Sequence, residues 1–416
     1  MDAGFFQVLS VRDFHRLILQ FHPLRAPAKL SLAELSGAVL AEGVDAPDDL
    51  PPFSRSAMDG YAVRAADLFG AGETSPGYLQ VIGSIAVGAI QETPIQPGQC
   101  MEIVTGAALP PGADAVVMVE YTESIAPDEI EVRRTVAPGE HLMFQGEDCR
   151  RGERILASGT RIRSQELGLL AALGVREASV HPRPEVGIIS SGDELVPPER
   201  EPGPGQIRDV NSLALQSGIV AGGATFRHFG IVPDELPAIQ AQLQAALETC
   251  DLVLISGGSS VGRRDFTIHA LQGFSDARIL AHGVSISPGK PTILASIQGK
   301  PVVGLPGQVT SVQVVFLVLV RPFIRRLAGE AGTAVFDRWP SVPAQLTRNL
   351  ASRQGREDYV RVRLEPSSDG NLPQAVPVFG KSGLLKTMLQ ADGLVRIPAE
   401  QEGLLKTSEV RVLVLG

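Results

Sequence analysis

The sequence predicts a multidomain fold in which a central α/β domain is joined to smaller β-rich domains. Strands and helices alternate between about residues 185 and 327, whereas short β-rich runs and Gly/Pro turns dominate before and after this region. The length of 416 residues allows two to four domains at about 100–200 residues each. The 44 glycines and 31 prolines, without a collagen-like period, indicate many turns. With 44% hydrophobic and 20% charged residues, the composition is typical of a globular protein.

Two helix starts are expected near the N-terminus. Ser10 and Asp13 form a possible capping pair, and the apolar residues of 10–21 then share one helical face. Ser31 and Glu34 form a second such pair, which precedes the run LAELSGAVLAEGV. The acidic and proline-rich segment 45–52 ends any helix.

A small β domain is expected from residue 53 to about 138. Its strands are predicted at YLQVIGSIAV, QCMEIVTG, DAVVMVEY and EIEVRRTV. A helix follows, with Ser164 as its N-cap and Gly174 as the first residue beyond its end. A proline-containing linker at about 176–184 closes this part of the chain.

The next part of the chain predicts a mostly parallel sheet covered on both faces. Strands are expected at 185–191, 224–232 and 251–258, a hairpin at 292–305, and helices at 211–220, 234–248, near Phe266 and up to about Leu327. Four further strand patterns beyond Gly329 predict a C-terminal β domain of about 85 residues.

Charge and cysteine content exclude several classes of protein. The 37 Lys+Arg and 46 Asp+Glu residues give a net charge of −9, which argues against nucleic-acid binding but permits a local basic pocket. Cys100, Cys149 and Cys250 are far apart and form no CxxC pair, so a disulfide framework and a cysteine zinc site are not expected. The apolar run 309–320 is too short to span a membrane, and no signal pattern precedes it. A cytoplasmic protein is therefore expected.

Two loops at the carboxyl ends of predicted parallel strands are candidates for phosphate binding. They read SSGDEL (190–195) and SGGSSVGRRD (256–265), and their glycines and serines offer donors to an anion. Either loop alone also fits an ordinary Gly-rich turn. Neither contains a dinucleotide fingerprint, and the sequence has no P-loop or HExxH motif.

Charged residues near these loops suggest further chemistry. Carboxylates that could hold Mg²⁺ together with phosphate oxygens are Asp193, Glu194, Asp209 and Asp265. Lys290 and Arg356 lie in turns where a cation can meet an oxyanion. Taken singly, each acid also fits a solvated or helix-capping role, and each cation also fits an ordinary surface charge.

Seven motifs, in this order, resemble one family, the molybdopterin molybdenumtransferases (the MoeA and gephyrin E-domain family). They are PPFSRSAMDGYAV, TGAALPPGADAVVMVE, GEDCRRGERILASGTRI, SSGDEL, SGGSSVGRRDF, SPGKPT and GREDYVRVRL. The resemblance implies a homodimer with its active site between subunits. It implies a partly helical linking and dimerisation domain (1–50 and 139–182), an inserted β domain (51–138), a molybdopterin-binding three-layer α/β/α domain (183–328) and a C-terminal β-barrel (329–416).

The resemblance also implies a reaction. Adenylylated molybdopterin is cleaved with Mg²⁺, AMP is released, and molybdate is inserted into the dithiolene. The resemblance implies Asp59, Glu194, Asp209 and Asp265 as candidate catalytic residues, and Asp193, Glu194 and Asp265 as metal ligands. The candidate substrate-binding residues are Thr105, Ser190, Gly192, Asp193, Ser256, Gly257, Gly258, Ser260 and Gly262, and those for molybdate are Lys290, Arg356 and Ser382. Molybdopterin adenylyltransferase and molybdoenzyme maturation proteins are implied as partners.

The sequence departs from the family pattern near the expected ligand site. Ser287 stands where the family commonly has lysine, residues 308–310 read Gln-Val-Thr instead of Asn-Pro-Val, and Ser259 replaces valine. Lys381, next to Ser382, is one candidate for restoring the lost charge. The departures motivate an alternative, a catalytically weakened molybdopterin-binding or scaffold protein. A third hypothesis is an adenylyltransferase-like or nucleotide-hydrolysing protein built on the α/β domain. The SAMDGYA and GREDYVRV segments argue against it because they lie outside that domain. The motifs do not discriminate molybdenum from tungsten.

Overall fold

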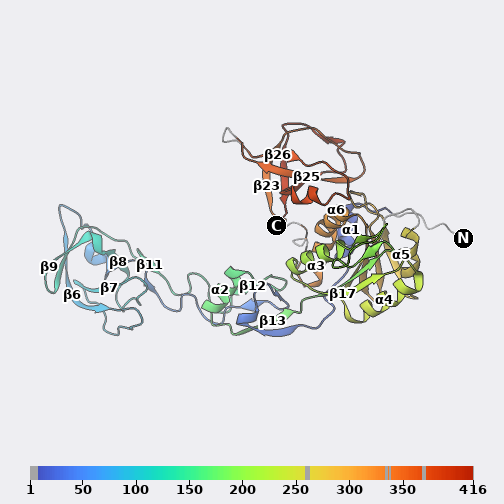
Figure 1. The fold of residues 1–416 in the computed structure, drawn as a ribbon. Helices are drawn as coiled ribbons and strands as arrows, with labels where there is room; N and C mark the ends of the chain where they lie inside the picture. Colours follow the sequence, from blue (N-terminus) through green and yellow to red (C-terminus); the bar gives the residue numbers. More distant parts are fainter. Residues whose placement is uncertain (1–7, 258–262, 333–335, 337–338, 368–371, 416) are drawn as a thin grey trace.

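The computed structural model describes residues 8–257, 263–332, 336, 339–367 and 372–415, apart from the side chains of residues 263–265. The molecule is elongated (Figure 1). One β-sheet lies at one end, the α/β sheet and the C-terminal barrel lie at the other, and α2 (Ser164–Ala172), β12 (Arg154–Leu156) and β13 (Glu177–His181) lie between them. No helix in the described part of the chain is long and apolar enough to cross a membrane.

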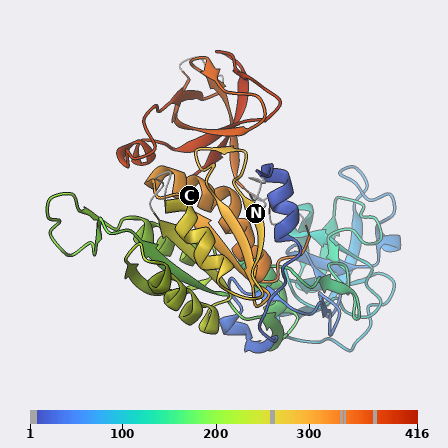
Figure 2. The same ribbon diagram turned by 90° about the vertical axis from the view of Figure 1, so that its right-hand side faces the viewer.

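The first expected helix is confirmed as α1 (Val11–Ile18). The hydroxyl of Ser10 accepts the backbone N–H of Asp13 at 3.0 Å, as the capping pair predicted. Phe14 and Ile18 are fully buried in a cluster that also contains residues of the α/β domain. Figure 2 shows α1 in dark blue beside the central sheet. The helix therefore packs with the α/β domain, and the predicted domain ranges themselves stay predictions.

The prediction of a second helix after Ser31 is wrong. Its capping box forms, but only the short 3₁₀ turn η1 (Leu32–Glu34) follows it. Gly37 has a φ of +74°, which a continuing helix does not permit, and β2 (Val39–Leu40) then pairs with β13. Tertiary strand pairing overrides the local helix signal here. A three-stranded sheet results, in the order β1 (Ala28–Ser31), β13, β2.

The expected helix α2 begins one residue earlier than predicted. Its N-cap is Arg163, whose backbone N–H donates to the carboxylate of Glu166 at 2.8 Å. The Arg163 guanidinium also donates to this carboxylate and, despite partial burial, lowers the pKa of Glu166 to about 2. Gly174, with a φ of +70°, lies just beyond the helix end as expected.

The first β-rich region forms a six-stranded sheet. Its order is β8 (Ala115–Met118), β5 (Gly60–Val63), β7 (Gln99–Ile103), β6 (Gly77–Ile85), β10 (Glu129–Val132), β9 (Thr122–Ala126). Two apolar clusters pack within this region, one around Leu79 and Val117 and the other around Met101 and Val116. The alternation of neighbouring residues such as Val116 and Val117 between clusters follows from the period of a strand.

The α/β region is a three-layer structure, as predicted. Its sheet runs in the order β17 (Thr225–Val232), β14 (Glu185–Ser191), β18 (Leu252–Gly257), β22 (Lys300–Leu305), β21 (Ile293–Ile297), β19 (Arg278–His282). The first four strands are parallel, β21 is antiparallel to β22, and β19 is antiparallel to β21. Helices α4 (Leu236–Thr249) and α5 (Arg263–Gln272) cover one face. Helices α1, α3 (Asn211–Ala221), α6 (Val309–Val315) and α7 (Arg321–Leu327) cover the other.

The C-terminal region closes into a five-stranded barrel. The strands pair in the order β25 (Glu357–Glu365), β26 (Gln374–Pro377), β23 (Ser341–Leu346), β29 (Glu409–Val414), β27 (Gly393–Ile397), and β27 pairs back to β25. Strand β20 (Ile286–Ser287) leaves the α/β region and pairs in parallel with β25. This pairing fixes the barrel against the loop that follows β20.

Candidate active site

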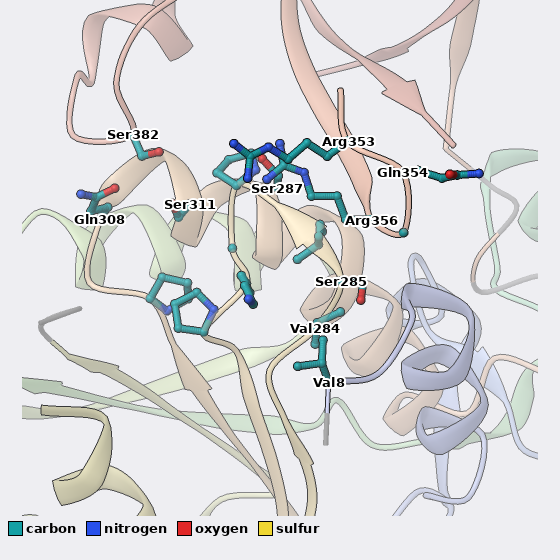
Figure 3. A pocket seen from close by; sticks show the side chains of 17 residues that line it. Val8, Val284, Ser285, Ser287, Gln308, Ser311, Arg353, Gln354, Arg356 and Ser382 are labelled. Atoms are coloured by element: carbon teal, nitrogen blue, oxygen red, sulfur yellow. The ribbon is translucent and has the colours of Figure 1, made fainter. Parts of the chain in front are cut away.

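A cavity of about 580 Å³ lies between the α/β region and the barrel. Its polar lining includes Ser287, Lys290, Gln308, Ser311, Arg353, Arg356 and Ser382 (Figure 3). These residues come from β20 and the segment after it, the start of α6, and two loops of the barrel. No Asp or Glu is among the described residues that line it. We call it the oxyanion cavity, because its charged groups are all cations.

Two long-range links bring this lining together. Ser287 pairs with Asp358 in the β20–β25 ladder, which sets Arg356 beside the segment that carries Lys290. On the other side, the backbone N–H and the hydroxyl of Thr310 both donate to the Ser382 carbonyl, at 3.1 and 2.8 Å. The barrel loop is thereby held at the start of α6.

The orientation of Arg356 is fixed by a buried carboxylate. A guanidinium nitrogen of Arg356 lies 2.9 Å from an oxygen of Asp358, which is only 6% exposed. The Ser352 hydroxyl donates to the other oxygen of Asp358 at 2.7 Å. Asp358 thus acts as a fixed partner that holds the guanidinium at the cavity wall.

The structure therefore brings together all three residues predicted to bind molybdate, namely Lys290, Arg356 and Ser382. It adds Arg353, which the sequence analysis missed because nothing in the run SRQGR distinguishes it from a surface charge. Lys381, which was considered as a replacement for the charge absent at Ser287, is exposed and is not among the lining residues. A fork donor, a point charge and hydroxyl donors in one cavity suit a small oxyanion.

The predicted phosphate loops follow adjacent parallel strands. Ser190 of β14 is in register with Ser256 of β18, and Gly257 ends β18. The amide of Asn211 donates to the Ser256 hydroxyl at 3.0 Å and to the Gly307 carbonyl at 2.9 Å. Asn211 was not predicted, and it connects the strand ends with the loop that leads into the oxyanion cavity.

Asp209 is buried and fully engaged. One of its oxygens accepts the backbone N–H groups of Asn211 and Ser212 at 3.1 Å, and the other accepts the Ser190 hydroxyl at 2.6 Å. Asp209 is 2% exposed. This carboxylate caps the start of α3 and positions Ser190, a geometry that favours a positioning role over direct contact with substrate.

Asp193 and Glu194 lie in the turn after β14, beside Gly192. An oxygen of Asp193 accepts the backbone N–H of Asp234 at 3.1 Å. Within the described residues there is no group of three or more His, Cys, Asp or Glu side chains placed to hold a metal ion. Four predicted site positions lie outside the described residues, namely Gly258, Ser260, Gly262 and the side chain of Asp265. Ser259, where the sequence departs from the family pattern, also lies outside them.

Asp59 and Thr105 meet at the strand ends of the six-stranded sheet of the first β-rich region, which we call the inserted sheet. Asp59 directly precedes β5, and Thr105 lies just after β7. An oxygen of Asp59 accepts both the backbone N–H and the hydroxyl of Thr105, at 2.6 and 2.8 Å. These bonds lower the pKa of the exposed Asp59 carboxyl. A Cβ at the adjacent Gly60 would lie 1.9 Å from the Val117 carbonyl, so the turn requires glycine. Figure 1 shows β7, which leads to Thr105, and α6 at opposite ends of the molecule.

Comparison with known proteins identifies the family of this chain. Three family models match in chain order: "MoeA N-terminal region (domain I and II)" at residues 9–174, "Probable molybdopterin binding domain" at 187–326, and "MoeA C-terminal region (domain IV)" at 343–415.

Full-length relatives agree with the family models. The molybdopterin molybdenumtransferase of Nostoc sp. is 36% identical over 421 residues, covering 98% of this chain and 94% of the relative. Molybdopterin molybdenumtransferase 2 of Mycobacterium tuberculosis is 34% identical over 397 residues, covering 94% and 96%. The crystal structure of the MoeA protein from Pyrococcus horikoshii OT3 matches with a TM-score of 0.82 and 30% identity, covering 98% and 100%. These names favour the transferase hypothesis and give no support to the scaffold alternative. The chain belongs to the MoeA family of molybdopterin molybdenumtransferases.

Proposed function

We propose that this protein inserts molybdate into the dithiolene of adenylylated molybdopterin and releases AMP. The observation that carries the proposal is the oxyanion cavity, where Lys290, Arg353 and Arg356 meet without a lining carboxylate. Molybdate is a dianion, and cations with serine donors are the groups expected to hold it. The names of the relatives supply the substrate class.

The phosphate end of the substrate is proposed to bind at the strand ends beside this cavity. Ligands of parallel α/β sheets bind beyond the carboxyl ends of the strands, where Ser190, Gly192, Ser256 and Gly257 lie. The Asn211 link to Gly307 supports one continuous site that joins the phosphate loops to the oxyanion cavity. Gly258, Ser260 and Gly262 are proposed, from the sequence alone, to extend the phosphate loop.

Mg²⁺ fits the donor chemistry of this region. Adjacent carboxylates at Asp193 and Glu194 provide hard oxygen ligands, and Mg²⁺ is usually held by one or two carboxylates together with substrate phosphates. Asp265 is a third proposed ligand, from the sequence alone. The bound ion would neutralise charge that develops on the phosphoanhydride during cleavage. Among the protein's own groups, Asp209 would hold Ser190 in place, and the three cations would keep molybdate beside the dithiolene.

A homodimer is proposed to complete the site. Asp59 is bonded to Thr105, which follows β7, and Figure 1 shows β7 at the opposite end of the molecule from α6, whose Ser311 lines the oxyanion cavity. A second copy can supply this pair if its inserted sheet reaches the cavity, and a two-fold dimer then contains two equivalent sites. Asp59 keeps its proposed catalytic role in this arrangement, contributed across the interface.

The cellular context is also a proposal. The three cysteines are unpaired and buried, which supports a reducing compartment such as the cytoplasm. A molybdopterin adenylyltransferase would supply the substrate, and molybdoenzyme maturation proteins would receive the product.

AMP release tests the proposed reaction directly. Purified protein is incubated with adenylylated molybdopterin, Mg²⁺ and molybdate, and AMP is quantified by chromatography. We expect AMP and molybdenum-loaded cofactor to form together, because one site performs both steps. Reactions without protein measure spontaneous cleavage. A failure to release AMP above that background at every molybdate concentration would contradict the proposal.

A further inference from the structure

A second cavity, of about 720 Å³, lies between α1, α7 and the barrel. It shares no lining residue with the oxyanion cavity. Its lining contains six arginines, which are Arg12, Arg16, Arg321, Arg325, Arg396 and Arg411. Glu357 is the single carboxylate among its described lining residues. We call it the arginine cavity. This concentration of cations contrasts with the net charge of −9 on the whole chain.

Three of the six arginines are neutralised by neighbouring carboxylates. Arg16 pairs with Asp13 at 2.8 Å, Arg325 with Glu330 at 2.7 Å, and Arg396 with Glu357 at 2.8 Å. Glu357 is further engaged, since it accepts the Tyr359 hydroxyl at 2.9 Å. The lining carboxylate is therefore committed to a partner within the protein.

The other three arginines form no salt bridge with a carboxylate in the described part of the chain, although Arg12 lies near Asp13, whose pKa is lowered first by the Ser10 hydroxyl and also by the charge of Arg12. They are Arg12 of α1, Arg321 at the start of α7 and Arg411 of β29. Asp337 and Arg338, of opposite charge, lie outside the described residues. Three separate chain regions thus each contribute a cation to one cavity. Like charges brought together in a partly enclosed space repel, so an anion bound between them would be stabilised.

Arg321 shows how this charge is held in place. Its guanidinium lies over the ring of Trp339, 4.5 Å from the centroid, and is half-buried. Burial and the nearby charge of Arg325 lower the pKa of Arg321. The aromatic ring orients the guanidinium without neutralising it, which leaves its donors available to a ligand.

The remaining walls are aromatic and apolar. The rings of His15 and Phe336 stack with centroids 4.2 Å apart, and Leu19, Leu317 and Leu413 also line the cavity. A volume of this size is in the range of small-molecule sites, at about 300–1,000 Å³. Arginine forks match the geometry of phosphate and carboxylate groups.

We propose that the arginine cavity is a binding site for a small polyanion that carries phosphate or carboxylate groups. The site is separate from the oxyanion cavity, and the inference does not depend on the proposed transferase reaction. Arg12, Arg321 and Arg411 would contact the anionic groups, and the aromatic wall would contact the ligand's carbon skeleton where it has one.

Trp339 makes the proposal directly measurable, because it is the only tryptophan in the chain. Pyrophosphate and citrate are titrated separately while chloride keeps the ionic strength constant, and tryptophan fluorescence and the melting temperature are recorded. We expect a saturable fluorescence change and a higher melting temperature, because a ligand that binds the folded state stabilises it. A response to pyrophosphate alone would assign the site to phosphate compounds. A response to both would assign it to polyanions of either kind.

Single substitutions locate the binding. Arg411→Gln and Arg12→Gln should each weaken binding about tenfold, the effect of losing one charged hydrogen-bond donor. Arg278→Gln is the matched control, since Arg278 is exposed on β19, outside both cavities. Lys290→Gln should also leave binding unchanged, which separates this site from the oxyanion cavity. The proposal is overturned if neither anion produces a saturable signal, or if Arg278→Gln weakens binding as much as Arg411→Gln.

Discussion

The oxyanion cavity and the Asp59–Thr105 pair differ in how completely one chain builds them. In the cavity, three cations from two regions of the chain are held together by the β20–β25 ladder and by the bonds from Thr310 to the Ser382 carbonyl. The Asp59 carboxylate accepts two hydrogen bonds from Thr105, and both residues are exposed beside β7, which Figure 1 shows at the other end of the molecule. The cations of the proposed site are thus brought together within one chain, whereas Asp59 and Thr105 are proposed to come from a second copy.

Mixing two inactive variants tests whether these halves meet across a dimer. Asp59→Asn and Lys290→Gln should each lower activity about 100-fold or more, because each removes a charged group proposed to act on the substrate. After subunit exchange, each mixed dimer contains one site with both groups intact. Random mixing should therefore restore about a quarter of wild-type AMP release.

The control for this mixing experiment is Asp128→Asn. Asp128 is an exposed aspartate in the turn between β9 and β10 of the same inserted sheet, and its substitution should leave activity unchanged. Size-exclusion chromatography with differently tagged subunits verifies the exchange. If verified mixed dimers recover no activity, Asp59 and Lys290 do not serve one intersubunit site.

Arg353 and Lys381 provide a second comparison at the oxyanion cavity, with a smaller expected effect on activity. Arg353 lines the cavity, whereas Lys381 is exposed and does not line it. Arg353→Gln should raise the KM for molybdate about tenfold and change kcat little, because it removes one of three cations that hold the anion. Lys381→Gln should leave the KM unchanged. An equal rise in both variants would instead favour Lys381 as the replacement for the charge absent at Ser287.

The sequence predicted those features that depend on local pattern. The alternation of strands and helices identified the parallel sheet, and the Gly-rich loops were found because they follow buried strands. The helix expected after Ser31 failed because β2 pairs with a strand about 140 residues away in the sequence, and pairing of this kind is invisible to a local pattern. Strand β23 was missed because it contains Pro343, which weakens a strand signal.

The residues of the candidate site also divide into those that the sequence predicted and those that only the fold reveals. Lys290 and Arg356 were predicted from their positions in turns and, together with Ser382, from the resemblance to a family, and the structure brings all three to one cavity. Arg353 and Asn211 carried no recognisable motif, and their positions depend on long-range contacts that only the fold reveals. The assigned roles of all these residues stay proposals.

Asp209 and Asp59 give the last comparison, in which the substitution of Asp209 by asparagine has the smallest expected effect on activity. Both carboxylates accept backbone and hydroxyl donors, but Asp209 is buried and Asp59 is exposed. Asp209→Ala leaves buried donors without a partner and should lower stability near α3 by about 2–4 kcal/mol, measured by amide hydrogen exchange. Asp59→Asn should leave this exchange unchanged.

The Asp209→Asn variant separates positioning from direct catalysis. Asparagine keeps an oxygen that can cap α3, and its amide can donate to the Ser190 hydroxyl, so stability should return close to that of the wild type. Activity should then fall by less than about tenfold, since the neutral side chain still positions Ser190. A loss of about 100-fold with native hydrogen exchange would show that the charge of Asp209 itself acts in the reaction. In that case the buried carboxylate would have the direct catalytic role that the family resemblance implied.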